Sequence, residues 1–159
     1  MKSRSAVTNI VVAGLGGQGV LKASDILAEV AFVSGLDVKK SEIHGMSQRG
    51  GSVSSDVRFG EQVFSPMVPE GQADFLVVIA PDQITVNQAV LGKSGILIEP
   101  SQIDEASLPN KKSINVALLG VLSRHLQFPV EAWTAALKRN LPAKLHEANL
   151  VAFNLGRDK

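Results

Sequence analysis

The chain has 159 residues, of which 45% are apolar, enough to fill the core of one domain covering residues 1–159. Lys and Arg (16) nearly balance Asp and Glu (15), and 4% of residues are aromatic, so we expect neither a nucleic-acid nor a membrane partner. There is no cysteine, which excludes a disulfide, a thiolate nucleophile and a sulfur-ligated iron–sulfur cluster within this chain.

The hydropathy pattern predicts a cytoplasmic protein. Residues 1–6 are too few and too polar for a secretory signal. No apolar stretch approaches the roughly 18 residues that a membrane span needs. A reducing compartment also agrees with the missing cysteines.

The first third of the chain predicts a strand–helix–strand unit. Residues 9–13 are a continuous apolar run rich in β-branched side chains, typical of a strand buried on both faces of a parallel sheet. Apolar residues then recur at helical spacing over residues 20–33, and Gly35 ends this helix. Residues 36–41 predict a second strand, so we expect a parallel, right-handed crossover.

The pattern changes after this unit. Residues 42–51 are polar and contain several glycines, which predicts a loop near the carboxyl end of the second strand. Apolar and polar side chains alternate over residues 53–59, and Gly60-Glu61 separates them from residues 62–64. We expect a β-hairpin formed by these two segments.

The remaining elements complete an α/β architecture. They are strands at 74–80 and 95–98, a helix beginning at Pro81-Asp82, and helices at 115–126, 130–141 and 143–153. The predicted fold is a three-layer α/β/α sandwich with a mostly parallel, Rossmann-like sheet, a β-hairpin insertion and a helical C-terminus.

A glycine-rich turn joins the first strand to the first helix. Gly14, Gly16, Gly17, Gln18 and Gly19 fit the G-x-G-x-x-G pattern in the strand-to-helix context that it requires. Small residues permit a tight turn, and the first amides of the helix carry partial positive charge suited to a phosphate. The alternative is that the glycines only allow the helix to pack closely on the sheet.

A dinucleotide site would also need an acidic residue at the end of the second strand, about 20 residues on. Glu42 stands near that position, although it opens a polar loop. The chain shows no second nucleotide-binding half. A stand-alone NAD(P)-binding oxidoreductase is therefore the alternative function.

The second loop carries an accessible guanidinium. Arg49 is flanked by Gly50 and Gly51, which suits recognition of a phosphate or carboxylate, whereas a structural pair with Asp56 or with a partner subunit explains it equally well. If the strands before the two loops are neighbours, the loops share one rim of the sheet. His44 is expected to be structural. No histidine stands at metal-ligand spacing, so no metal site and no catalytic residue are predicted.

Three sequence segments together resemble the gamma-type subunit of 2-oxoacid:ferredoxin oxidoreductases, and most closely the small (beta) subunit of the indolepyruvate enzymes. They are GLGGQGVL at 14–21, SEIHGMSQRGGSV at 41–53 and SPMVPEG at 65–71. Segments 115–120 and 149–153 also look like family positions, so the resemblance covers nearly the whole chain.

The resemblance implies a complex that decarboxylates a 2-oxoacid oxidatively, joins the acyl group to coenzyme A and reduces ferredoxin. Thiamine diphosphate, Mg and the iron–sulfur clusters are then expected on a larger partner subunit, with no cofactor held by this chain alone. The chain would be inactive by itself. In isolation it is compatible with a homodimer, and the 2-oxoacid is left open.

The resemblance also implies roles for the two loops. The turn at Gly14, Gly16, Gly17, Gln18 and Gly19 would lie against coenzyme A or against a partner's backbone, with Arg49 as the principal ligand-binding residue. The remaining loop residues would face the active-site side of the interface: His44, Met46, Ser47, Gln48, Gly50 and Gly51. A scaffold subunit without a ligand is the other alternative.

Overall fold

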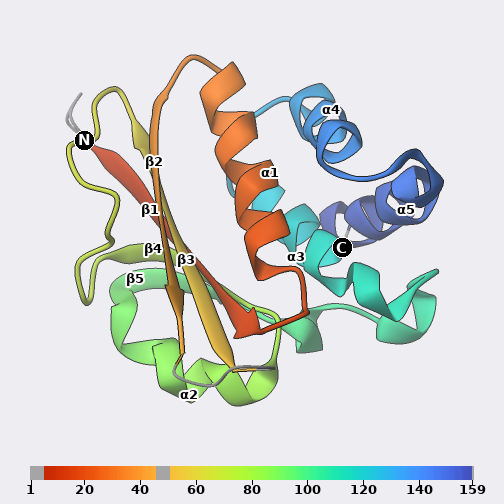
Figure 1. Ribbon diagram of the computed structural model, residues 1–159, viewed down its shortest axis with the longest axis horizontal. Helices are drawn as coiled ribbons and strands as arrows, with labels where there is room; N and C mark the ends of the chain where they lie inside the picture. Colours follow the sequence, from red (N-terminus) through yellow and green to blue (C-terminus); the bar gives the residue numbers. More distant parts are fainter. Residues whose placement is uncertain (1–5, 46–50, 159) are drawn as a thin grey trace.

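The computed structural model describes residues 6–45 and 51–158 and contains one five-stranded sheet (Figure 1). The strands are β1 (Val7–Leu15), β2 (Asp37–His44), β3 (Ser52–Gly60), β4 (Ala73–Val78) and β5 (Leu91–Ile98), in the spatial order β2-β3-β1-β4-β5. Strand β3 is antiparallel to both of its neighbours, while β1, β4 and β5 are parallel. Four of the five strands therefore run in one direction, and the predicted mostly parallel sheet is confirmed.

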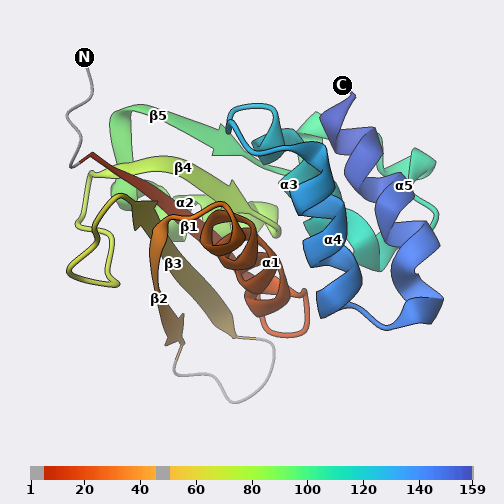
Figure 2. The same ribbon diagram turned by 90° about the horizontal axis from the view of Figure 1, so that it is seen from above.

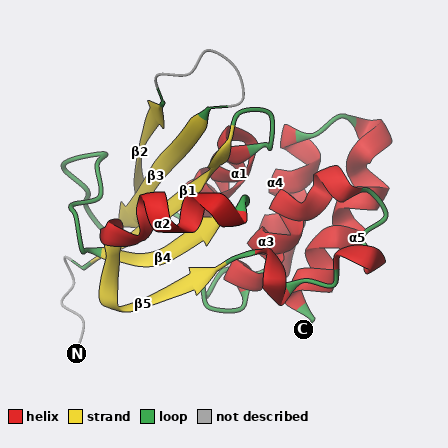
Figure 3. Ribbon diagram, turned by 90° about the horizontal axis from the view of Figure 1, so that it is seen from below, coloured by secondary structure: helices red, strands yellow, loops and turns green. Residues whose placement is uncertain are grey.

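Helices cover the two faces of the sheet unequally (Figures 2 and 3). The helices are α1 (Val20–Val33), α2 (Ile84–Asn87), α3 (Ile114–Ser123), α4 (Val130–Asn140) and α5 (His146–Arg157). Helices α1 and α3 pack on one face, α4 and α5 extend that layer, and α2 with its flanking 3-10 turns covers the other face. The predicted three-layer arrangement and helical C-terminus are confirmed.

Two separate hydrophobic clusters form the core. The larger cluster joins the sheet to the four-helix layer and contains the completely buried Trp133 and Phe153. The smaller cluster lies under α2, where Val11, Leu76 and Val78 of the sheet meet Val68 and the partly buried Ile84. The long apolar runs of β1 and β4 face both clusters, which explains why these strands lack alternation.

The hairpin predicted between residues 53–59 and 62–64 is absent, and β3 pairs with other strands. Residues 53–59 pair with β2 on one side and with β1 on the other, whereas residues 62–64 are irregular. Residues 42–44, expected in a loop, continue β2. Because β3 lies between β1 and β2, the two strands joined by α1 are parallel in direction without being neighbours.

Carboxylates of the sheet hold the segment that follows β3. Asp37 accepts a hydrogen bond from the N–H of Val63 at 2.8 Å, and Asp56 accepts one from the N–H of Val68 at 2.9 Å. The Val63 N–H and the Lys39 ammonium lower the pKa of Asp37. Burial raises the pKa of Asp56 despite its bond to Val68. Side-chain bonds to single backbone amides thus replace the predicted second strand of the hairpin.

Helices α3 and α5 pack backbone against backbone. A Cβ at Gly120 would clash with the carbonyl oxygen of Phe153, and a Cβ at Gly156 would clash with that of Ala117. Side chains at either position would push the helices apart. The pair of glycines therefore sets how closely α5 approaches the buried helix α3.

Candidate functional site

The glycine turn is closed by hydrogen bonds within itself. It connects β1 to α1, and the side-chain oxygen of Gln18 accepts a hydrogen bond from the N–H of Leu15 at 2.8 Å. The N–H of Gln18 in turn donates to the carbonyl of Leu15 at 3.1 Å. Gln18 was predicted to bind a cofactor, and here its side-chain oxygen holds the turn together.

Gly19 precedes α1 in a conformation that favours glycine, with φ of +79°. A Cβ at this position would clash with the side-chain amide of Asn115, a buried residue at the start of α3. That amide donates to the carbonyl of Gly19 at 3.2 Å, and its oxygen accepts from the N–H of Val116 at 2.9 Å. Contact with α3 therefore requires a glycine here, whether or not a ligand binds.

The second loop begins and ends beside this turn. The N–H of Gly16 donates to the carbonyl of Gly51 at 2.8 Å, and the N–H of Gly45 donates to the carbonyl of Ser52 at 2.6 Å. The Ser52 hydroxyl donates to the side-chain oxygen of the buried Gln83 at 2.7 Å, which ties the loop end to the segment after β4. In the part of the chain that the structure describes, the two predicted loops thus meet at one rim of the sheet.

The remaining residues of the second loop lie outside the described residues. They are Met46, Ser47, Gln48, Arg49 and Gly50. Their predicted roles at an interface stay predictions. The structure places one end of this loop, Gly51, against Gly16 of the glycine turn, and bonds the other end, Gly45, to Ser52.

A cavity of about 250 Å³ opens between the turn, the first helical turn of α1 and the end of β2. Two side chains in its wall can carry positive charge, Lys22 from α1 and His44 from β2. The other lining residues are small or apolar: Leu15, Gly16, Gly17, Gly19, Val20, Leu21 and Val53. Sequence reasoning found His44 and the glycines but missed Lys22. Its position three residues after the turn, on the first turn of a helix, was the available signal.

The amides around this cavity fall into two groups. The amides of Leu15, Gly16 and Gln18 donate hydrogen bonds to oxygen atoms of the protein. The first bond of the helix is donated by Ala23 to Gly19 at 3.0 Å, so the preceding amides of α1 form no hydrogen bond within the helix. A helix start with such amides, together with Lys22, suits an anionic group.

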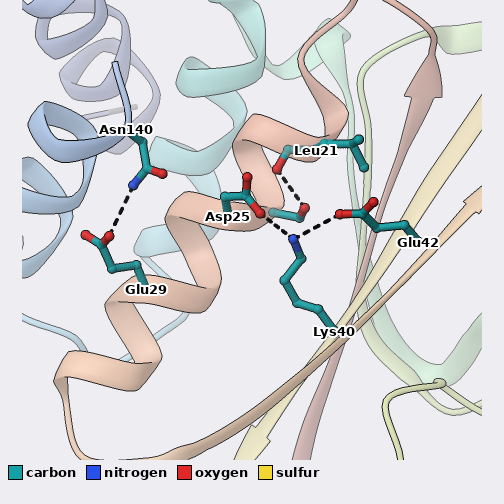
Figure 4. Close-up of polar contacts among 7 residues, drawn as sticks. Leu21, Asp25, Glu29, Lys40, Glu42 and Asn140 are labelled. Atoms are coloured by element: carbon teal, nitrogen blue, oxygen red, sulfur yellow. Dashed lines mark hydrogen bonds and ion pairs between the residues drawn. The ribbon is translucent and has the colours of Figure 1, made fainter. Parts of the chain in front are cut away.

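Glu42 occupies a different environment from a ribose-binding acid. Lys40 forms ion pairs with Asp25 of α1 and with Glu42, at 3.3 Å for the latter (Figure 4). In a dinucleotide site the acidic residue ends the strand next to β1. Here β3 occupies that neighbouring position and β2 is the outer strand, so the arrangement does not favour the dinucleotide alternative.

Two features are absent from residues 6–45 and 51–158. No group of three or more His, Cys, Asp or Glu side chains is placed to hold a metal ion there. None of the helices in these ranges has the length and apolar character needed to cross a bilayer.

Comparison with known proteins identifies the family. The family model for pyruvate ferredoxin/flavodoxin oxidoreductase matches residues 9–109. Indolepyruvate oxidoreductase subunit IorB of Thermococcus kodakarensis is 34% identical, over 93% of each chain. This confirms the resemblance seen in the sequence segments.

Two solved structures share the fold. One is the gamma subunit of a keto/oxoacid ferredoxin oxidoreductase from Geobacter sulfurreducens (TM-score 0.81, 24% identity, 98% of this chain and 97% of that one). The other is a 2-oxoglutarate:ferredoxin oxidoreductase from Magnetococcus marinus with 2-oxoglutarate, coenzyme A and succinyl-CoA bound (TM-score 0.81, 16% identity). This chain matches 99% of its own length to 31% of that larger polypeptide. The chain therefore belongs to the pyruvate ferredoxin/flavodoxin oxidoreductase family.

Proposed function

We propose that this chain is the accessory small subunit of a 2-oxoacid:ferredoxin oxidoreductase acting on indolepyruvate or a related arylpyruvate. The complex makes acyl-CoA, CO2 and reduced ferredoxin. The observation that carries the proposal is the 34% identity to an indolepyruvate oxidoreductase subunit over 93% of both chains. The five-strand sheet with its glycine turn supports the same family assignment.

The chain takes part in this reaction as a non-autonomous subunit. It has no cysteine, so thiolate-ligated iron–sulfur clusters are held by another polypeptide. No glycine-aspartate-glycine segment for the diphosphate and magnesium of a thiamine cofactor occurs in its sequence. Electron transfer and decarboxylation therefore belong to a larger partner subunit.

The contribution of this chain is to guide coenzyme A to the shared active site. A phosphate of coenzyme A would accept hydrogen bonds from the first amides of α1, with the ammonium of Lys22 beside it. His44 closes the other wall of the same cavity. Arg49 lies between the two loop ends that are anchored at this rim, at Gly45 and Gly51, and is proposed to contribute its guanidinium from there.

A scaffold subunit without a ligand is the second candidate, and one observation favours it. Contact with Asn115 accounts for the absence of a side chain at Gly19, and contacts with Gln18, Val20 and Ile79 account for it at Gly14. Packing alone thus explains two of the glycines. The ammonium of Lys22 and the imidazole of His44 in the cavity wall are what packing leaves unexplained.

Steady-state kinetics of the reconstituted complex separate the two candidates. We expect Lys22→Ala to raise the apparent KM for coenzyme A by roughly ten- to 100-fold, because one charge-assisted hydrogen bond contributes about 1.5–3 kcal/mol. Assembly and the KM for the 2-oxoacid should not change. Lys138→Ala, an exposed lysine on α4, is the matched control. Equal kinetics for both variants would favour the scaffold.

A second variant tests the loop. Arg49→Ala is expected to raise the KM for coenzyme A in the same complex while leaving the amount of assembled complex unchanged. Unaltered turnover, affinity and assembly would refute a role for Arg49.

A further inference from the structure

The two outer strands of the sheet differ in how well they are protected against pairing with another strand. Strand β2 carries the charged residues Asp37, Lys39, Lys40 and Glu42, whereas β5 carries one, Lys93. Charged side chains on an edge strand are a common protection against further strand pairing. Strand β5 instead exposes Ile96, of which 37% is accessible. Strand β5 also has a register shift opposite Ala73 and Phe75, so residues 96–98, which pair regularly with β4, form the part of this edge that is open to an added strand.

A cavity of about 550 Å³ lies beside this open edge. Ser94 and Ile96 of β5 form one side of the cavity, and Phe75 of β4 and Phe128 form part of its apolar wall. The ring of His125, at the end of α3, lies 5.5 Å from that of Phe75 between centroids. Because alternate side chains of a strand point to the same face, a strand added to β5 would place a side chain over this cavity.

The part of the chain around β5 is strongly acidic. Residues 61–105 contain one cation, Lys93, and seven carboxylates: Glu61, Glu70, Asp74, Asp82, Glu99, Asp104 and Glu105. Within the described ranges, none of these carboxylates forms an ion pair with a lysine or arginine. Asp74 also forms part of the cavity wall. A partner at this edge therefore gains from carrying positive charge.

We propose that β5 is the docking edge for an extended, cationic segment of the larger subunit. This segment adds to the sheet as a further strand, inserts an apolar side chain into the cavity beside Ile96, and places lysine or arginine side chains near Asp74. Main-chain hydrogen bonds supply affinity, and the cavity and the carboxylates supply specificity. The inference rests on the proposed function for the existence of the larger subunit.

Hydrogen exchange of the assembled complex tests the proposal directly. The backbone amides of residues 96–98 that are not bonded to β4 should exchange at least about tenfold more slowly in the complex than in the isolated chain, because an added strand takes up these unpaired groups. The amides of residues 37–41, at the opposite edge and away from the His44 cavity, should be unchanged. Assembly without protection of β5 would overturn the proposal and leave the proposed function intact. Failure to assemble with a larger subunit would instead overturn the proposed function, and with it the proposal that a segment of that subunit docks at β5.

Variants at the cavity provide a second measurement, the Kd for the larger subunit. Ile96→Glu should weaken binding by about tenfold or more, since it places a carboxylate where an apolar side chain inserts. Val151→Glu on α5 is the matched control, because Val151 is also a β-branched residue and 48% exposed. Ser94→Trp, which fills the same cavity, serves where Ile96→Glu does not fold.

The two variants also distinguish other occupants of the edge. Equal loss of binding in the β5 variants and in Val151→Glu would contradict the proposal. A dimer of the isolated chain that Ile96→Glu dissociates would assign the edge to a second copy of this chain, and would likewise contradict it.

Discussion

The contact between Gly19 and Asn115 makes Gly19→Ala a sharp test of how the glycine turn is built. An alanine at φ of +79° adopts a left-handed conformation that costs about 1–2 kcal/mol for a residue with a side chain. Its Cβ would also displace the Asn115 amide and break the bond to the Gly19 carbonyl, a loss of about 1 kcal/mol. We expect the free energy of unfolding to fall by about 2–3 kcal/mol in total.

Gly17→Ala is the matched control for this prediction. Gly17 has a similar φ of +88°, yet a Cβ there would have nothing within 4 Å. Its substitution should therefore show the conformational cost alone, about 1–2 kcal/mol. Urea unfolding of both variants measures the difference, which reports the contact with Asn115.

A double-mutant cycle isolates that contact. In an Asn115→Ala background the clash is absent, so the cost of Gly19→Ala should fall to that of Gly17→Ala, with a coupling of about 1 kcal/mol. Additive effects of Gly19→Ala and Asn115→Ala, or equal costs at Gly17 and Gly19 in the wild-type background, would refute the structural explanation.

Three further predictions concern the core and the sheet. Gly120→Ala should lower the free energy of unfolding by about 3 kcal/mol or more, because the backbone of α5 blocks its Cβ; a loss under about 1 kcal/mol in urea would contradict this. Trp133→Phe should stay within about 1 kcal/mol of wild type by thermal unfolding, since the lost volume is offset by removal of a buried Nε1–H that has no hydrogen-bond partner among the described residues. Because the folded pKa of Asp56 is raised, wild type should gain stability relative to Asp56→Asn as the pH falls through that pKa towards 3.8, and urea unfolding showing the opposite trend would exclude burial as the cause.

The sequence predicts best the strands and helices whose hydropathy pattern follows the burial of their own side chains. Strands β1 and β4 are uninterrupted apolar runs, and α1 has helical periodicity, so their positions agree with the structure to within a few residues. The helices after residue 113 are separated where prolines stop them, at Pro129 and Pro142.

The end of β2 and its pairing with β3 could not be predicted from the local hydropathy pattern. Its last residues, Glu42, Ile43 and His44, are exposed at the edge of the sheet, so their polarity resembles that of a loop. Insertion of β3 between β1 and β2 depends on pairing of residues as far apart as Val7 and Gly60. Local patterns carry no information on such a register. The sequence therefore left open whether β1 and β2 are neighbours, and the structure separates them.

In the candidate site, too, local features could be predicted from the sequence and long-range contacts could not. The glycine turn is visible in the sequence because its spacing is local. The bond from Asn115 to Gly19 joins residues 96 positions apart, and no local pattern signals it. The bond from Ser52 to Gln83 is likewise long-range. Consequently the sequence identified the glycine turn as a candidate site, while the structure identified the residues that hold the turn and the loop in place.

Reconstitution of ferredoxin reduction with purified subunits tests the central claim most directly. The account predicts that indolepyruvate-dependent and coenzyme A-dependent reduction of ferredoxin requires both this chain and the larger subunit, and that neither polypeptide is active alone. Full activity of the larger subunit without this chain, or NAD(P)-dependent oxidoreductase activity of this chain by itself, would contradict it.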